Sequence, residues 1–482
     1  MEHFVSQLFT GDYFLARFAF QRGLALIYLV AFLSALNHFR PLLGENGLLP
    51  VPQFLRFLRF DHAPSIFHFG YSDGLFLAVA WSGIILSALA LIGLTEKIPW
   101  WGAGAILGIL WVLYLSIVNV GQVFYSFGWE SMLLEAGFLA IFLGNNKIAV
   151  PFLIIFLLRW MLFRLEFGAG LIKIRGDECW RDLTCLQYHH ETQPMANPLS
   201  WYFHNLPAGF HRLETLGNHF FQLVVPWGLF FPQPVAAISA GLIILSQSWL
   251  VLSGNFSWLN WLTIVLALSG FSNAQLGKLI PLSVPALLAQ PLMHKGVVVL
   301  ISAALLVASW WPLRNLFSKR QLMNASFNQY HVMNSYGAFG SVTKERYEIV
   351  IEGTDETAIT QDTAWKAYEF KGKPGDPMRR PAQFAPYHLR LDWLMWFQAF
   401  NPPGRYEQWF VRFLEKLLQG DRAVLALLRH NPFPAGPPRF IRARYYRYHF
   451  TTAKERAESG AWWKRELIAE YLPPASLREA HK

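Results

Sequence analysis

Charged residues are scarce in this chain. Asp, Glu, Lys and Arg make up only 15% of its 482 residues, whereas soluble domains average about 25%. Hydrophobic residues make up 54% and aromatic residues 16%. This composition excludes an ordinary water-soluble protein and places most of the chain in a lipid bilayer.

Cysteine is also rare, because the chain contains only Cys179 and Cys185. Two cysteines do not make a disulfide scaffold, but they can form one small disulfide on an oxidising side of a membrane. Alternatively, both remain buried thiols. A zinc site needs more ligands, and the nearby His189 and His190 do not complete a standard zinc spacing. We therefore expect no metal site and no cofactor.

Several sequence motifs are missing. The chain has no Ser-His-Asp order, phosphate-binding loop or metal motif that would define a reaction. It has no nucleic-acid-binding motif, so nucleic acid is not an expected partner. The first residues lack a short apolar core followed by a cleavage site, so we expect no cleavable signal peptide. The first membrane helix would then act as the targeting signal.

Long apolar runs dominate the first two-thirds of the chain. A helix needs about 20 mostly apolar residues to cross a bilayer. The runs predict about nine transmembrane helices: 18–36, 75–94, 101–118, 124–143, 149–172, 216–231, 235–252, 258–270 and 297–311. Three prolines in 280–292 predict an irregular or re-entrant segment there. Basic residues in the short loops do not decide the orientation clearly.

The last third of the chain differs in composition. From residue 313 onward it has 26 Lys and Arg against 17 Asp and Glu, which is typical of a soluble domain or of one that lies near anionic headgroups. Alternating residues predict strands at 345–352, 367–371 and 440–450, with Glu348 on the solvent side. Short helices are expected at 391–400, 408–419 and 423–430, the last capped by Asp421.

The predicted fold is therefore a polytopic α-helical membrane protein with a C-terminal soluble mixed α+β domain. We expect a transmembrane domain over residues 1–312, with a polar loop at 173–214. The soluble domain would follow over residues 313–482.

Five ionisable residues lie inside the predicted fourth and fifth helices, where each costs about 2.5–3.5 kcal/mol unless it is paired or faces a wet cavity. They are Glu130, Glu135, Arg159, Arg164 and Glu166. An Arg–Glu pair between the two helices would satisfy both charges. The alternative interpretation is a polar cavity lined by these side chains.

Lys173 ends the fifth predicted helix and begins the polar stretch KIRGDECWRDLTCLQYHHETQP. Gly168, Ala169 and Gly170 precede it, and such small residues allow neighbouring helices to approach closely. The lysine could extend toward the headgroups. Alternatively, a partly desolvated amine could act as a base.

Several blocks of the chain resemble the lipase maturation factor family. They are NPLSWYFHNLP (197–207), SGNFSWLNWLT (253–263), YHVMNSYGAFGSVTKERYEIVIEGT (330–354), KPGDPMRRPAQFAPYHLRLDWLMWF (373–397) and GAWWKRELIAEYLPP (460–474). The resemblance implies a membrane protein that assists the folding and assembly of dimeric lipases in the endoplasmic reticulum. It also implies a C-terminal region that faces the lumen and contacts the client lipase.

The segment GLIKIRGDECW is also similar, more distantly, to the vitamin K-dependent γ-glutamyl carboxylases. That resemblance would give Lys173 a catalytic role. It also implies an N-terminus in the cytoplasm and a tail on the lumenal or periplasmic side.

Two hypotheses about function follow. The first is a maturation factor for secreted lipases or other secreted proteins, for which we expect no catalytic activity and in which Arg390, Trp393 and Trp396 contact the client. It would lie in the endoplasmic reticulum membrane of a eukaryote or the inner membrane of a bacterium, in contact with membrane lipids. The second is a membrane enzyme acting on a lipid-soluble or protein substrate. In it, Lys173 is the base, Glu130 or Glu135 orients it, and His189 or His190 carries protons.

Overall fold

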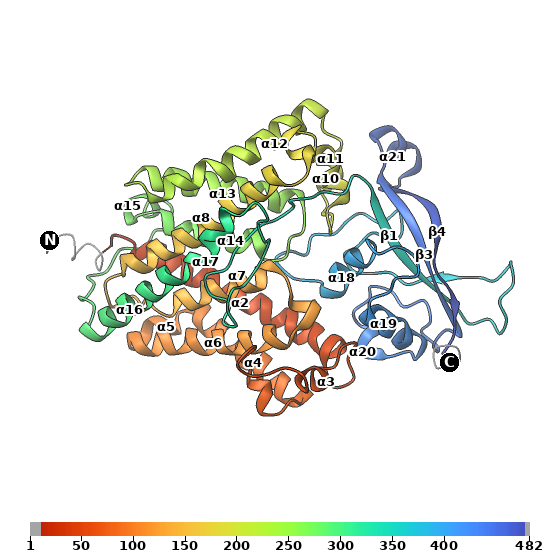
Figure 1. Cartoon of the computed structure of the whole chain (residues 1–482), viewed down its shortest axis with the longest axis horizontal. Coiled ribbons are helices and arrows are strands. Elements are labelled where there is room, and N and C mark those ends of the chain that lie inside the picture. The colour runs from red at the N-terminus through yellow and green to blue at the C-terminus, as the bar shows by residue number, and fades with distance from the viewer. Residues whose placement is uncertain (1–10, 478–482) are drawn as a thin grey trace.

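The computed structural model describes residues 11–477 and consists of a helical bundle joined to a small sheet (Figure 1). The expectation about a signal peptide falls largely on residues 1–10, which lie outside the described residues. The helices of the bundle are α2 (Phe14–Leu43), α3 (Val51–Leu55), α4 (Asp73–Ile92), α5 (Leu94–Lys97), α6 (Trp100–Val120), α7 (Gly128–Ala140), α8 (Phe152–Arg175), α9 (Glu178–Arg181), α10 (Leu186–Thr192), α11 (Ser200–His204), α12 (Ala208–Leu223), α13 (Val235–Ser253), α14 (Leu259–Ala267), α15 (Asn273–Leu276), α16 (Leu292–Ala308) and α17 (Trp310–Leu316). Short 3-10 helices are η1 (Ile66–Phe69), η2 (Gln122–Tyr125), η3 (Val225–Phe230) and η4 (Leu268–Gly270).

Five helices within the described residues are long and apolar enough to cross a membrane. They are Phe14–Leu43, Asp73–Ile92, Trp100–Val120, Val235–Ser253 and the continuous run Leu292–Leu316. The other four predicted spans do not form such helices. α7 has 13 residues and α14 has nine, the span predicted at 216–231 is divided between the end of α12 and η3, and α8 is long but carries several charges.

Local sequence signals explain where these helices begin and end. The Ser72 side chain accepts a hydrogen bond from the Leu75 N–H at the start of α4, and Gly93 ends that helix in the left-handed conformation. Prolines stand immediately before α6 and α8. The proline-rich stretch before α16 forms no helix between Leu276 and Leu292, as its three prolines predict.

The C-terminal part contains a four-stranded antiparallel sheet in the order β2-β1-β3-β4. Its strands are β1 (Arg346–Thr354), β2 (Lys366–Ala367), β3 (Phe440–Phe450) and β4 (Trp463–Ala475), and its helices are α18 (Arg390–Gln398), α19 (Gln408–Leu418), α20 (Arg422–Leu425) and α21 (Ala453–Ser459). The strand predicted at 440–450 is confirmed, and Asp421 caps α20 as expected.

Two details of the sheet differ from the prediction. The alternation that predicted a strand over 367–371 yields only the two-residue β2. Glu348 was expected to face solvent, but it is fully buried, because basic side chains on the same side of the sheet form ion pairs with it. The sequence pattern did not predict the edge strand β4.

The sheet domain packs directly on one end of the bundle rather than hanging from it (Figure 1). The hydrophobic core is continuous from α2, α6 and α7 into α18 and α19. At the junction the Trp129 ring lies 4.8 Å from that of Trp393, and Trp258 donates a hydrogen bond to the Trp129 carbonyl. The two parts therefore share one apolar interface.

Candidate functional site

A cavity of about 1330 Å³ lies where the bundle meets the C-terminal domain. Its walls come from α8, α10, α12, α13, α14 and α18 and from the segment after α17. It brings together six of the residues singled out from the sequence: Glu166, Lys173, His189, His190, Trp393 and Trp396. Its aromatic and aliphatic walls with a few polar groups are typical of a ligand-binding chamber.

Lys173 points into this cavity rather than toward a headgroup layer. The side chain is buried, and its ammonium donates hydrogen bonds to Asn218 Oδ1 (3.0 Å) and Gln222 Oε1 (2.8 Å). It also lies 4.9 Å from the centre of the Trp180 ring. The structure therefore supports the interpretation of Lys173 as a desolvated amine and not as a side chain that extends toward the headgroups.

The small residues before Lys173 act as predicted. A Cβ on Gly168 would lie 2.5 Å from the Tyr336 carbonyl oxygen, and one on Gly170 would lie 2.7 Å from Leu223. Both glycines therefore let α8 approach its neighbours closely. This close approach places Lys173 against α12.

Glu166 lies two turns before Lys173 on α8 and lines the same cavity. Gln247 donates a hydrogen bond to Glu166 Oε1 (2.7 Å), and Asn260 donates one to Gln247 Oε1 (2.7 Å). This chain of amides connects α13 and α14 to the carboxylate. Glu166 and Lys173 are thus each held at the cavity wall by hydrogen bonds to side-chain amides.

The two histidines have different surroundings. His189 is buried, its ring centre 4.8 Å from that of Phe339, and burial, reinforced by the neighbouring His190 and Lys173, lowers its pKa to about 3. It is therefore neutral at physiological pH. His190 instead directs Nε2 toward Glu214 Oε2, 3.3 Å away.

Glu130 and Glu135 do not reach the cavity, which corrects their expected place beside Lys173. Glu130 Oε1 accepts a hydrogen bond from Arg390 Nη1 (2.6 Å), and Tyr114 bonds its other oxygen. Glu135 pairs with Arg164. Both carboxylates are held by cationic partners, so neither is free to orient a base.

The predicted Arg–Glu pair between the fourth and fifth spans is confirmed by Arg164 and Glu135. Glu135 also accepts hydrogen bonds from the Asn334 backbone N–H (2.9 Å) and the Tyr336 hydroxyl (2.8 Å). Within residues 11–477, Arg159 has no acidic partner; it donates to the carbonyls of Ser269 (2.9 Å) and Leu229 (3.2 Å). Glu135 thus ties the segment after α17 to the bundle.

Two of the three expected client-binding residues are almost fully buried. Arg390 is 0% exposed and Trp393 is 3% exposed, because Arg390 forms the ion pair with Glu130 and Trp393 packs on Trp129. Trp396 lines the cavity, beside Phe397 and Phe400, which are 44% and 48% exposed. Of the three expected residues, Trp396 is therefore the one best placed to touch another molecule.

Cys179 and Cys185 form a disulfide. It lies next to the cavity-lining Trp180 in a small buried cluster, and the Trp180 indole donates a hydrogen bond to the Phe339 carbonyl (2.8 Å). The disulfide closes the turn that contains α9. It therefore stabilises the polar loop just beyond Lys173.

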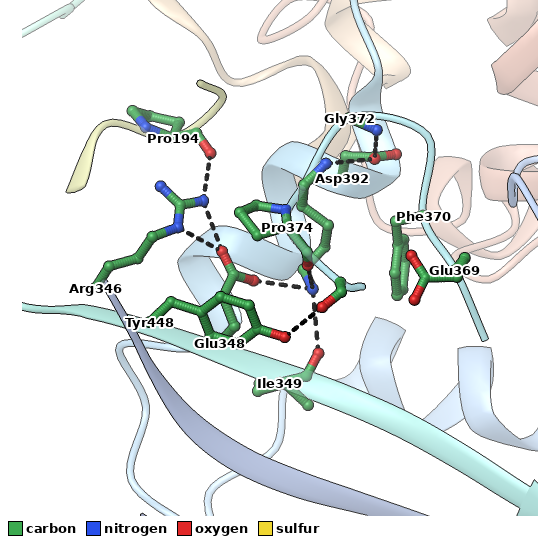
Figure 2. Close-up of polar contacts among 12 residues, drawn as sticks. Pro194, Arg346, Glu348, Ile349, Glu369, Phe370, Gly372, Pro374, Asp392 and Tyr448 are labelled. Atoms are coloured by element: carbon green, nitrogen blue, oxygen red, sulfur yellow. Dashed lines mark hydrogen bonds and ion pairs between the residues drawn. The ribbon is translucent and has the colours of Figure 1, made fainter. Parts of the chain in front are cut away.

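Sequence reasoning missed a buried ionic cluster at the base of the sheet, shown in Figure 2. Glu348 Oε1 pairs with Arg346 (2.6 Å), and Glu348 Oε2 pairs with Lys373 (2.9 Å). Arg346 also donates to the backbone carbonyls of Glu191 in the last turn of α10 and of Gln193 and Pro194 in the loop that follows (Figure 2 shows the bond to Pro194). The cluster therefore fastens the sheet to the wall of the cavity.

Asp392 and His449 complete this junction. Asp392 accepts backbone N–H bonds from Gly372 (2.6 Å) and Lys373 (3.2 Å), and burial raises its pKa (Figure 2). His449 Nδ1 lies 2.9 Å from Glu191 Oε1, and this hydrogen bond raises the pKa of the histidine. The end of α10 and the loop after it are thus held by residues of β1 and β3.

The second missed group is His211 and Glu214, three residues apart on α12. His211 Nδ1 lies 3.3 Å from the same Glu214 Oε2 atom that faces His190. The Trp249 indole donates to Glu214 Oε1 (2.6 Å). Neither residue stands near His190 in the sequence, so spacing alone could not identify the group.

Comparisons with known proteins cover nearly the whole chain. Residues 15–278 match the family described as lipase maturation factor transmembrane domain, and residues 332–473 match lipase maturation factor C-terminal domain. The chain is 44% identical over 513 residues to lipase maturation factor 1 of Homo sapiens, covering 98% of this chain and 90% of that protein. It is 43% identical to the protein of that name from Mus musculus, covering 98% and 89%. Lipase maturation factor 2 of Xenopus laevis is 29% identical, covering 97% and 83%. No solved structure matches the chain.

Proposed function

This chain belongs to the lipase maturation factor family, and we propose that it assists the folding and assembly of secreted lipases at the membrane in which it is embedded. The observation that carries the proposal is the match over both parts of the chain, at 44% identity across 98% of its length. The continuous core between bundle and sheet supports it, because both parts act as one unit.

The proposed membrane domain has nine passes, ending near residue 312. Contacts support alternating directions. At one end of the bundle, Gly11 pairs with Val150, Asn145 bonds the Ile98 carbonyl, and Ile148 pairs with Leu288. At the other end, Arg40 contacts Asp73 and Gln193 contacts the Ser253 carbonyl. Consecutive long helices therefore begin and end at opposite faces.

The C-terminal domain lies on the lumenal side of the endoplasmic reticulum in this proposal, or on the periplasmic side if the chain is bacterial. The Cys179–Cys185 disulfide supports it, because the bond lies at the same end of the bundle as the sheet and disulfides persist in oxidising compartments.

Glycosylation mapping in microsomes tests this orientation. Ala358→Asn creates the acceptor triplet Asn-Ile-Thr in an exposed loop of the C-terminal domain. Pro281→Asn creates Asn-Leu-Ser in the exposed stretch at the opposite end. We expect a glycan only on the Ala358→Asn variant, measured as a glycosidase-sensitive size shift against the parent chain. A glycan only on the Pro281→Asn variant would reverse the proposed orientation.

Client contact is proposed at the aromatic group of Trp396, Phe397 and Phe400, since aromatic side chains dominate binding hot spots. The test uses cells that lack their own lipase maturation factors and express a dimeric lipase. Secreted lipase activity should be restored by the parent chain and fall about five-fold or more with Trp396→Ala. Phe57→Ala, which alters a phenylalanine that is 89% exposed elsewhere, is the matched control. If the parent chain restores no secretion, lipases of this kind are not its clients.

The enzyme hypothesis retains support from the cavity that holds Lys173, Glu166 and His189. Lys173→Met separates the two functions. A maturation factor without catalysis should still restore secretion, whereas an enzyme should lose activity at unchanged protein level. Asn218→Ala removes a hydrogen bond of the same amine but keeps the amine itself, so it controls for a purely structural effect.

A further inference from the structure

Three side chains of the kinds that bind metal ions lie close together at the edge of the cavity. His190, His211 and Glu214 each offer one ligand atom, and these atoms lie within 4.8 Å of one another. Both histidines are almost fully buried, at 2% exposure each. They come from two helices, His190 from α10 and the other two from adjacent turns of α12.

Two distances in this group match the spacing of two ligands on one metal ion. His190 Nε2 and His211 Nδ1 each lie 3.3 Å from the same oxygen, Glu214 Oε2. Hydrogen bonds from N–H to oxygen cluster near about 2.9 Å. Two ligands bound to one tetrahedral zinc ion at about 2.0–2.1 Å lie roughly 3.3 Å apart.

Neighbouring groups hold the candidate ligand side chains in place through hydrogen bonds. Trp249 donates to Glu214 Oε1, which leaves Oε2 as the single oxygen turned toward the histidines. The His204 carbonyl holds the distal nitrogen of His211. Such partners orient the ligands and set the histidine tautomer in metal sites.

We propose that His190, His211 and Glu214 form a binding site for a divalent transition-metal ion, with zinc as the ion best matched by two imidazoles and one carboxylate. Because His190 and Glu214 line the cavity, the fourth coordination position would open into it. The ion would tie α10 to α12 and offer a Lewis-acidic position to a molecule in the cavity. This inference is independent of the proposed lipase maturation activity.

Metal analysis of the purified full-length chain tests the proposal. The protein is prepared in detergent with a tag that contains no histidine, stripped with a chelator and dialysed against zinc. We expect about one equivalent of zinc per chain, and X-ray absorption should show nitrogen and oxygen ligands at about 2.0–2.1 Å. Glu214→Gln and His211→Asn should each weaken binding at least about ten-fold.

His219→Gln is the matched control, because His219 lies on the same helix but contacts the Trp180 carbonyl instead. This variant should bind zinc like the parent. Added zinc should also raise the melting temperature of the parent and of this control, but not of the two ligand variants. That comparison remains valid if a variant is less stable. Absence of binding by the parent, or equal binding by all four proteins, would overturn the proposal.

Discussion

The ion pair between Glu130 and Arg390 should control how firmly the C-terminal domain is attached to the bundle. Glu130 is 1% exposed and Arg390 is 0% exposed. Arg390 also donates to the Phe124 carbonyl (2.8 Å), and its guanidinium lies 3.5 Å from the centre of the Tyr125 ring. Both charges are thus removed from water and compensated mainly by each other.

Arg390→Met would leave the Glu130 carboxylate buried without its cation. Breaking a buried pair in this way costs about 3–5 kcal/mol. For a domain of this size, that corresponds to a fall in melting temperature of roughly 10 °C. Glu130→Gln should cost a similar amount. The double variant should lose clearly less than the sum of the single variants, because neither charge then remains alone.

Thermal unfolding in detergent, followed by tryptophan fluorescence, measures these changes, and the rate at which protease releases the C-terminal domain gives a second readout. Arg405→Met, at an exposed arginine of the same domain, is the control and should change little. If Arg390→Met lowers stability no more than this control, or if the single changes add fully in the double variant, the reasoning about the pair is wrong.

Three further changes should alter stability in defined directions. Burial and the neighbouring Arg390 hold the pKa of His388 well below its ordinary value of 6.5. Below pH 6.5 the unfolded chain therefore gains a proton at this histidine that the folded chain excludes. The free energy of unfolding should then fall by up to about 1.4 kcal/mol for each unit by which the pH is lowered. His388→Asn should flatten that slope between pH 7.5 and 5.5, whereas the exposed His62→Asn should not. Glu348→Gln removes the carboxylate between two buried cations, and calorimetry should show a loss of about 3–5 kcal/mol; a loss below about 1 kcal/mol would mean that the cluster does not hold the sheet. Cys185→Ser opens a short loop, so we expect a loss of about 2 kcal/mol, and an unchanged melting temperature would contradict it.

Periodicity predicted the parts of this fold in which one face of an element is apolar. The strand at 440–450 and the cap at Asp421 were predictable because their signals are local. Long apolar runs likewise predicted the five helices that can cross a membrane. Such signals depend on neighbouring residues and not on the rest of the fold.

The candidate site was predictable only in part, for a physical reason. Lys173, Glu166 and the two histidines were identified because charged or polar residues stand out at the end of an apolar run. Glu130 was misplaced because its partner, Arg390, lies 260 residues away. Alternation alone also cannot show that a carboxylate such as Glu348 is buried among cations from distant segments.

The distance along the chain between Glu130 and Arg390 sets an order of events during biosynthesis. Glu135 has its arginine within 29 residues, so its charge can be neutralised while the bundle is still being inserted. Glu130 must await a partner made 260 residues later, which is roughly 15 to 50 s at ordinary rates of translation. During that interval the bundle carries an uncompensated carboxylate at the place that α18 will cover. The last third of the chain therefore completes the membrane domain, and a truncated product would be left with a detectable defect inside its bundle.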